Sequence, residues 1–207
     1  MIALIDYGAG NLTSVRKALT ALGAEFHTPQ SPEECASASG LIVPGVGNFA
    51  ATAALEGPWR DTIAKVVAGG IPLFGICLGM QWLFEGSDEA PEVKGLAVLP
   101  GRVTRLRGNA EQRLKIPHVG WNALETHGSR AMTSRLLGEV PPRAHVYFTH
   151  SYAAPVTADC VASTTHAEPF AAMVERDRIF GVQFHPEKSG EAGLQILRNF
   201  LAVCSAC

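Results

Sequence analysis

Short apolar runs that end in glycine or proline constrain the fold of this chain more than any other feature of its sequence. Ile2–Ile5, Leu41–Val43 and Ile71–Ile76 are too short to be buried helices, so we expect buried strands there. Helical patterns lie between them, with apolar residues along one face in 12–22 and a second helical stretch in 59–68. Because strands that alternate with helices form parallel sheets covered on both faces, the first half predicts an α/β fold.

The second half has a different order of predicted elements, because its strand patterns follow one another without long helices between them. These patterns lie at residues 103–106, 146–152, 161–165, 170–175 and 179–184. Arg176-Asp177-Arg178 separates the last two, which predicts an antiparallel hairpin. A final helical pattern spans residues 189–203. Together the two halves predict an open, mostly parallel sheet flanked by helices, with antiparallel strands added in the second half.

The composition is that of an ordinary globular protein without attraction for polyanions. Hydrophobic residues make up 47% of the 207 residues and the formal net charge is −2, so we expect a large core and no nucleic acid partner. No run approaches the roughly 20 apolar residues of a membrane span, and the N-terminus lacks the pattern of a signal peptide. We expect one domain over residues 1–207.

The five cysteines are an odd number, which predicts free thiols in a reducing compartment and hence a cytoplasmic protein. Cys204 and Cys207 form a lone CxxC pair at the end of the chain, without a second pair to complete a zinc site. We therefore expect neither a metal nor another cofactor.

Gly75-Ile76-Cys77-Leu78-Gly79 lies where an apolar strand gives way to a helical run. The pattern matches a nucleophile elbow, in which small neighbours let the chain bend sharply and expose the nucleophile above the sheet. The N-terminus of the following helix favours the thiolate form of such a cysteine. A buried structural cysteine is the alternative, because cysteine is among the most buried residue types.

Gln183-Phe184-His185-Pro186-Glu187 supplies a candidate base and a candidate orienting carboxylate for Cys77. Pro186 disfavours helix at His185, and in an extended segment side chains two positions apart point to the same side. His185 and Glu187 then stand together, and with Cys77 they make the three parts of a catalytic triad. The alternative is a histidine at a strand end beside an unrelated surface glutamate.

Val43-Pro44-Gly45-Val46-Gly47-Asn48 follows a predicted strand and should lie at the carboxyl edge of the sheet, where ligands bind in α/β folds. Its glycines would let backbone N–H groups approach a substrate and stabilise an oxyanion. A dinucleotide loop is the competing interpretation, because Gly45-x-Gly47-x-x-Ala50 and Gly8-x-Gly10 both echo the nucleotide fingerprint. That match is weak, since no clear acidic residue follows at the distance that ribose binding needs.

Taken together, these motifs resemble the class I, or triad, glutamine amidotransferases, whose domain has a flavodoxin-like fold. The resemblance extends from Asp6 to the final helix. The matching segments are Asp6–Asn11, Pro44–Gly47, Gly75–Gln81, Pro117–Asn122, His150–Tyr152 and His185–Ser189. The sequence PHVGWN at 117–122, and PGVG rather than PGG at 44–47, resemble the branch of the family that serves histidine biosynthesis.

The resemblance implies an enzyme that hydrolyses the side-chain amide of glutamine and releases ammonia. Cys77 is the implied nucleophile, His185 the proton carrier, and Glu187 the group that orients the imidazole. The backbone N–H groups of Val46 and Leu78 are the implied oxyanion hole.

The resemblance also implies which residues surround the glutamine substrate. The implied substrate-binding residues are Gly45, Gly47, Gln81, Glu89, Ser151 and Tyr152. Asp88 stands next to Glu89, so the register of that loop, and the carboxylate that faces the substrate, stay open at this point.

A partner is implied as well, because the chain has neither a phosphate loop for an acceptor nor room for another domain. The resemblance names a cyclase subunit with a (β/α)8 barrel, which receives the ammonia through a tunnel in a heterodimer. The candidate interface residues are Asn11, Pro117, His118, Trp121, Asn122 and Lys188.

Three other functions stay open from the sequence. Within the family, related glutaminases serve pyridoxal phosphate, anthranilate or GMP synthesis. Outside it, the chain would be a nucleotide-binding or regulatory module with an idle Cys77, or a cysteine hydrolase that acts alone on other amides. Each of these leaves several of the matching segments without a purpose.

Overall fold

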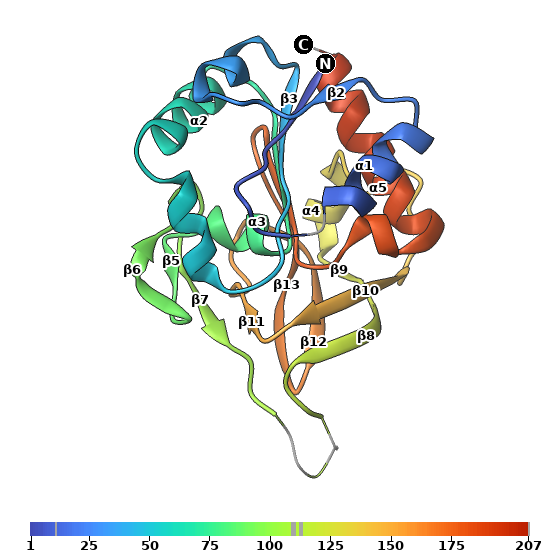
Figure 1. Cartoon of the computed structure of the whole chain (residues 1–207). Helices are drawn as coiled ribbons and strands as arrows, with labels where there is room; N and C mark the ends of the chain where they lie inside the picture. Colours follow the sequence, from blue (N-terminus) through green and yellow to red (C-terminus); the bar gives the residue numbers. More distant parts are fainter. Residues whose placement is uncertain (11, 109–110, 112–113, 207) are drawn as a thin grey trace.

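The computed structural model describes residues 1–10, 12–108, 111 and 114–206 (Figure 1). Its centre is an eight-stranded sheet in the order β2-β1-β3-β4-β14-β13-β12-β9. The parallel strands are β1 Ile2–Leu4, β2 Phe26–His27, β3 Gly40–Val43, β4 Leu73–Ile76 and β14 Ile179–Val182. The antiparallel strands that extend the sheet are β13 Glu168–Arg176, β12 Cys160–His166 and β9 Glu125–Thr126.

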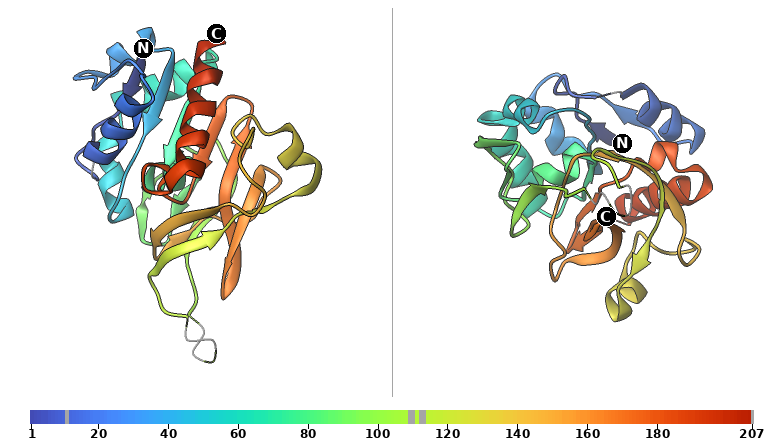
Figure 2. Two further views of the ribbon diagram at one scale, coloured as in Figure 1. Left: turned by 90° about the vertical axis from the view of Figure 1, so that its right-hand side faces the viewer. Right: turned by 90° about the horizontal axis from the view of Figure 1, so that it is seen from below.

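Helices cover both faces of this sheet (Figures 1 and 2). On one face lie α1 Leu12–Ala21 and α5 Gly190–Ser205, and on the other lie α2 Pro58–Ala68 and α3 Leu78–Trp82. The short helical turns are η1 Pro32–Ser37, η2 Phe49–Leu55, α4 Gly128–Thr133 and η3 Pro186–Lys188. The predicted α/β fold, with helices on both faces and antiparallel strands in the second half, is confirmed.

The apolar runs are continuous because the sheet is buried on both sides. In β1, Ile2 and Leu4 pack into the core beneath α1 and α5, whereas Ala3 and the following residue Ile5 pack into the core beneath α2. Successive side chains of a strand point to opposite faces, so each apolar position serves one core or the other. Both cores therefore rest on the same few strands.

Two smaller sheets lie beyond the carboxyl ends of the parallel strands, in the lower part of Figure 1. One has the order β11-β7-β5-β6 and the other pairs β10 with β8. Their strands are β5 Gly86–Ser87, β6 Ala90–Lys94, β7 Arg102–Arg105, β8 His118–Ala123, β10 His145–His150 and β11 Tyr152–Ala153. Over the described part of the chain, none of the helices has the length and apolar character that crossing a membrane requires.

The structure divides the strand that the sequence predicts over residues 146–152. β10 ends at His150 and pairs with β8, while β11 begins at Tyr152 and pairs with β7 in the other small sheet. Ser151 is thus the point where the chain passes from one sheet to the next. An apolar pattern records burial and not the identity of the pairing strand, so it gives no sign of this break.

Two glycines let β3, β4 and α3 meet closely at the strand-to-helix turn. A Cβ on Gly79 would lie 1.7 Å from the carbonyl oxygen of Val43, and one on Gly75 would lie 2.6 Å from the carbonyl oxygen of Gly79. Both neighbours are backbone atoms, which cannot rotate aside. The G-x-C-x-G spacing is therefore a packing requirement of this turn.

Replacing Gly79 with alanine should destabilise the fold by about 2–3 kcal/mol, because the added methyl group forces α3 away from β3. Gly138→Ala is the control, since its Cβ would meet only the Asn199 side chain at an ordinary 3.7 Å. The control should change stability by less than about 1 kcal/mol. Urea unfolding of both variants measures the difference, and equal stabilities would contradict the tight α3–β3 contact.

Candidate active site

Cys77 and His185 follow neighbouring strands at the same edge of the main sheet. β4 and β14 are parallel, with Ile76 opposite Val182, so the two chain segments leave the sheet at the same level. Cys77 has φ of 52° and ψ of −105° at the start of α3. Such a positive φ is uncommon for a residue with a side chain and is the strained turn expected of a nucleophile elbow.

His185 and Glu187 form a buried pair beside Cys77. His185 Nδ1 lies 2.9 Å from Glu187 Oε1, and the two side chains are 2% and 3% exposed. Burial opposes a positive charge on His185, but the neighbouring Cys77 and Glu187 side chains outweigh it and raise the pKa to about 10. Nε2 of His185 is buried and forms no hydrogen bond. The raised pKa favours the protonated imidazole beside the cysteine, and its Nε2 is the ring nitrogen left for proton transfer.

The segment 44–47 closes the other side of the site. The carbonyl oxygen of Gly45 accepts a hydrogen bond from the Leu78 N–H at 3.3 Å. A Cβ on Gly45 would lie 2.0 Å from the Tyr7 hydroxyl, and one on Gly10 would lie 3.0 Å from the Val46 nitrogen. The peptides of the two predicted oxyanion donors, Val46 and Leu78, are thus neighbours, and the Leu78 N–H is already engaged.

A cavity of about 230 Å³ opens directly on Cys77. Its lining residues are Gly47, Cys77, Leu78, Gln81, Glu89, Pro117, Thr149, His150, Ser151 and Tyr152. Five of the six predicted substrate-binding residues are among them. Gly45 lines a smaller recess instead, together with Val46, His185 and Glu187.

The carboxylate of Glu89, and not that of Asp88, faces this cavity. Glu89 Oε2 accepts the Phe49 N–H at 2.8 Å, whereas Asp88 points away and pairs with Arg102 at 3.3 Å. In the loop register of the structure, Glu89 is thus the carboxylate at the cavity.

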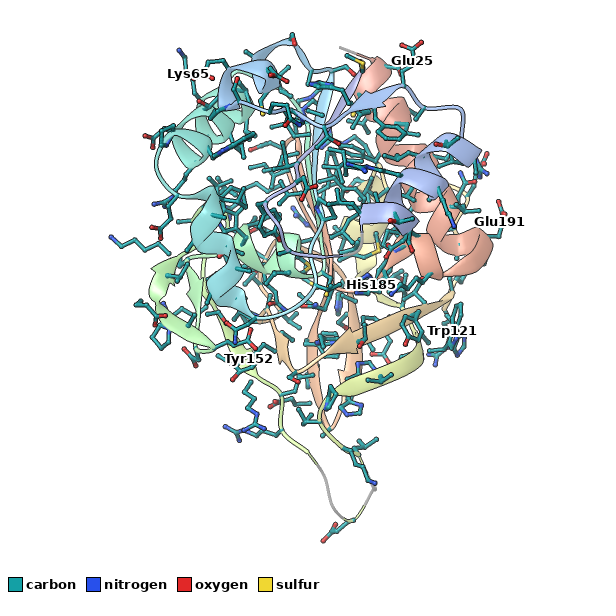
Figure 3. The ribbon with its side chains drawn as sticks, in the orientation of Figure 1. Glu25, Lys65, Trp121, Tyr152, His185 and Glu191 are labelled. Atoms are coloured by element: carbon teal, nitrogen blue, oxygen red, sulfur yellow. The ribbon has the colours of Figure 1, made fainter. Side chains whose placement is uncertain are left out.

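The structure distributes the predicted interface residues over several environments. Asn11 lies outside the described residues. Trp121 is 56% exposed on β8, at the outer edge of the molecule in Figure 3, and Lys188 lies over the Tyr147 ring. Asn122 donates to the Thr165 carbonyl, Pro117 lines the cavity, and His118 is buried.

His118 and His150 form a buried pair that the sequence does not predict. The Tyr152 carbonyl lies 2.9 Å from His150 Nδ1 and can only accept, so Nδ1 carries the proton. His150 Nε2 is then the acceptor for His118 Nδ1 at 3.2 Å. Burial above all lowers the pKa of His118 to about 4 and that of His150 to about 3. Among the described residues, no group of His, Cys, Asp or Glu side chains is arranged to hold a metal.

Comparison with known proteins shows which family the chain is similar to. The family of class-I glutamine amidotransferases matches residues 3–204. The imidazole glycerol phosphate synthase subunit HisH of Methanothermobacter thermautotrophicus is 44% identical, with 100% of both chains covered. Imidazole glycerol phosphate synthase hisHF of Arabidopsis thaliana, a chloroplastic protein, is 42% identical over 97% of this chain and 34% of its own length.

The fold has relatives among solved structures as well. A crystal structure of a glutamine amidotransferase superposes with a TM-score of 0.74 at 21% identity, covering 99% of this chain and 98% of the other. At that identity the likeness concerns the fold alone.

Acid should destabilise the protein through the buried histidine pair. The pKa of His118, about 4 when folded, lies below the usual value of about 6.5, so the unfolded chain binds the proton first as pH falls. Stability is therefore complete above about pH 6.5 and is lost toward pH 4, by about 2 kcal/mol between pH 7 and pH 5 for this residue.

Urea unfolding at pH 7 and pH 5 measures this loss in wild type and in His118→Asn, which keeps a donor toward His150. The variant should lose about 2 kcal/mol less than wild type over this interval. The exposed His145→Asn serves as the control and should behave as wild type does. An equal loss in all three proteins would contradict a neutral His118.

Proposed function

The chain belongs to the class-I glutamine amidotransferases and, within them, to the HisH subunits of imidazole glycerol phosphate synthase, and from this premise we propose how its residues release ammonia from glutamine. It is a glutaminase subunit of an enzyme complex of histidine biosynthesis. The observation that carries the proposed mechanism is that Cys77 lines the main cavity while the buried pair of His185 and Glu187 lies directly beside it.

Cys77 is the nucleophile of this proposal. Its thiolate attacks the side-chain carbonyl carbon of glutamine and forms a tetrahedral intermediate. His185 then gives its Nε2 proton to the leaving nitrogen, the C–N bond breaks, and ammonia departs from a glutamyl thioester. Water attacks the thioester, His185 takes a proton from that water, and glutamate leaves with the sulfur again as a thiolate. Glu187 holds the imidazole by Nδ1 throughout.

The oxyanion hole requires a change at the segment 44–47. The N–H groups of Val46 and Leu78 are the proposed donors, but the Gly45 carbonyl now accepts the Leu78 N–H at 3.3 Å. A turn of the Gly45–Val46 peptide would free one donor and bring in the other. Gly45 and Gly47 flank Val46, and their lack of side chains leaves the backbone free to adopt either state; Gly47 already has φ of 111°, which other residues disfavour. We propose that the loaded partner favours this turned state.

The cavity residues divide the recognition of glutamine between its charged groups. We propose that Glu89 binds the α-ammonium, since its carboxylate faces the cavity. Gln81 offers its Oε1 as a second acceptor for this ammonium, because its Nε2 already donates to the Tyr152 carbonyl and to Gln183. The α-carboxylate can bind to backbone and hydroxyl donors of Ser151 and Tyr152 and to the N–H of Gly47. Gly45 shapes the approach to Cys77.

The partner in this proposal is a cyclase subunit with a (β/α)8 barrel. It would use the ammonia to convert a phosphoribulosyl precursor into imidazole glycerol phosphate and aminoimidazole carboxamide ribotide. The length of the Arabidopsis relative supports a close partnership, because this chain covers only 34% of that protein. Ammonia kept from water stays unprotonated and nucleophilic, which favours a tunnel across the interface.

We propose the exposed face of β8 as the centre of that interface. Val119 and Trp121 are 57% and 56% exposed and lie two positions apart, so both side chains stand on the same face of the strand. Lys188 flanks them through Tyr147, and Pro117 continues the proposed contact toward the cavity. The Asn122 side chain lies on the His118 side of the strand, where it donates to the Thr165 carbonyl. His118 points inward from the same strand and supports this face from behind.

Two further parts of the proposal rest on simpler observations. We take residues 1–207 as one amidotransferase domain, because both cores pack on the same sheet. We place the complex in the cytoplasm, because Cys35, Cys77 and Cys160 are buried thiols without disulfides. Glutaminases of pyridoxal phosphate, anthranilate or GMP synthesis are less favoured, since the relatives above are synthase subunits of another product.

Glutamate release from glutamine tests the mechanism. The purified chain with the cyclase subunit and its ribotide substrate should release glutamate at least about tenfold faster than the chain alone. Cys77→Ala should lower the rate by more than about 10³-fold, because the covalent pathway is lost. If no condition yields glutamate although both proteins are folded and associated, Cys77 is a structural residue.

Calorimetric titration with the cyclase subunit tests the interface. Trp121→Ala should weaken binding by roughly 10- to 100-fold, because an exposed tryptophan at the centre of a contact carries much of the binding energy. Met132→Ala is the matched control, since Met132 is 88% exposed but lies on α4. Equal affinities of the two variants would remove β8 from the interface.

A further inference from the structure

Gln183 is a fully buried amide that lies against the nucleophile. It follows β14 by one residue, its exposed fraction is 0%, and its Nε2 lies 3.6 Å from the Cys77 sulfur, a hydrogen-bond distance for this large atom. Its Oε1 accepts a hydrogen bond from Gln81 Nε2 at 3.1 Å. Gln81 in turn donates from the same nitrogen to the Tyr152 carbonyl at 2.9 Å.

The direction of this chain of hydrogen bonds follows from one backbone group. A carbonyl oxygen can only accept, so the Gln81 atom that touches Tyr152 must be the nitrogen. The same nitrogen touches Gln183, and the Gln183 atom that meets it must therefore be the oxygen. The amide nitrogen of Gln183 is then the atom left to face Cys77. A flipped amide at either position would set two donors or two acceptors against each other.

We propose that Gln183 is a further catalytic residue of this site, which donates a hydrogen bond to the Cys77 sulfur and thereby stabilises and aims the thiolate. The inference deepens the proposed glutaminase function and rests on it. A hydrogen bond to a charged group is stronger than one between neutral groups, and it is stronger still where water is excluded. The buried amide supplies such a donor at all times, without movement.

The assignment gives the two partners of the sulfur different tasks. His185 must keep Nε2 available for proton transfer, and this nitrogen forms no hydrogen bond in the structure. Gln183 exchanges no proton and is held on its other side by Gln81. The thiolate therefore keeps a stabilising donor while the imidazole shuttles protons between the leaving nitrogen and water.

Alkylation of Cys77 by iodoacetamide, followed at the Cys77 peptide by mass spectrometry across pH, tests the proposal without need of glutaminase activity. In Gln183→Met, which keeps the volume but lacks the donor, the midpoint of the alkylation profile should move up by about one pH unit. In Gln183→Glu, which keeps the shape but sets a carboxylate against the sulfur, it should move further.

A matched control separates catalysis from stability. Thr164 is also fully buried, and its hydroxyl donates to the Ala123 carbonyl at 2.9 Å, so Thr164→Val removes a comparable buried hydrogen bond. This variant should be less stable than wild type but leave the alkylation profile unchanged. In the complex with the cyclase subunit, Gln183→Met should lower kcat by about 10- to 100-fold and change KM by less than about twofold.

The outcomes distinguish the two proposals. A Gln183→Met profile identical to that of wild type, together with lower stability, would make Gln183 a structural amide and overturn the inference. A shifted profile in a protein that releases no glutamate under any condition would keep the contact with the thiolate and reject the glutaminase function instead.

Discussion

The parallel pairing of β4 with β14 is the contact on which the rest of the site depends. These strands are separated by more than a hundred residues in the sequence, yet their register sets Ile76 opposite Val182. Cys77 and His185 leave the sheet at one level because of that register. A shift of one residue would turn every side chain of β14 to the opposite face and separate His185 from Cys77, the proposed proton carrier and nucleophile.

The sequence predicted the first half of the fold well, because a sheet buried on both faces demands continuous apolar runs, such as Leu41–Val43, that nothing else explains. It predicted the small sheets poorly. β8 has only His118 and Ala123 buried, and hydrogen bonding to β10 rather than an apolar face holds it in place. The break at Ser151 could not be predicted from the sequence either, because the strands on its two sides are both half-buried although they belong to different sheets.

The site divides along a similar line. The elbow of Cys77 and the pairing of His185 with Glu187 follow from local rules, because glycine spacing and a proline act within a few residues. Gln183 carries no such local signal. Its contact with Cys77 depends on Gln81 and on the carbonyl of Tyr152, which are distant in sequence, so only the folded chain brings the three together.

The hydrogen bond from the Leu78 N–H to the Gly45 carbonyl has a consequence for the supply of glutamine in the cell. Glutamine is abundant wherever nitrogen is being assimilated, and a glutaminase that was active without its partner would deplete it. With the donor occupied by its own backbone, the subunit rests in a silent state under the proposed mechanism. Loss of the contact with the partner would then stop histidine synthesis without increasing the hydrolysis of glutamine.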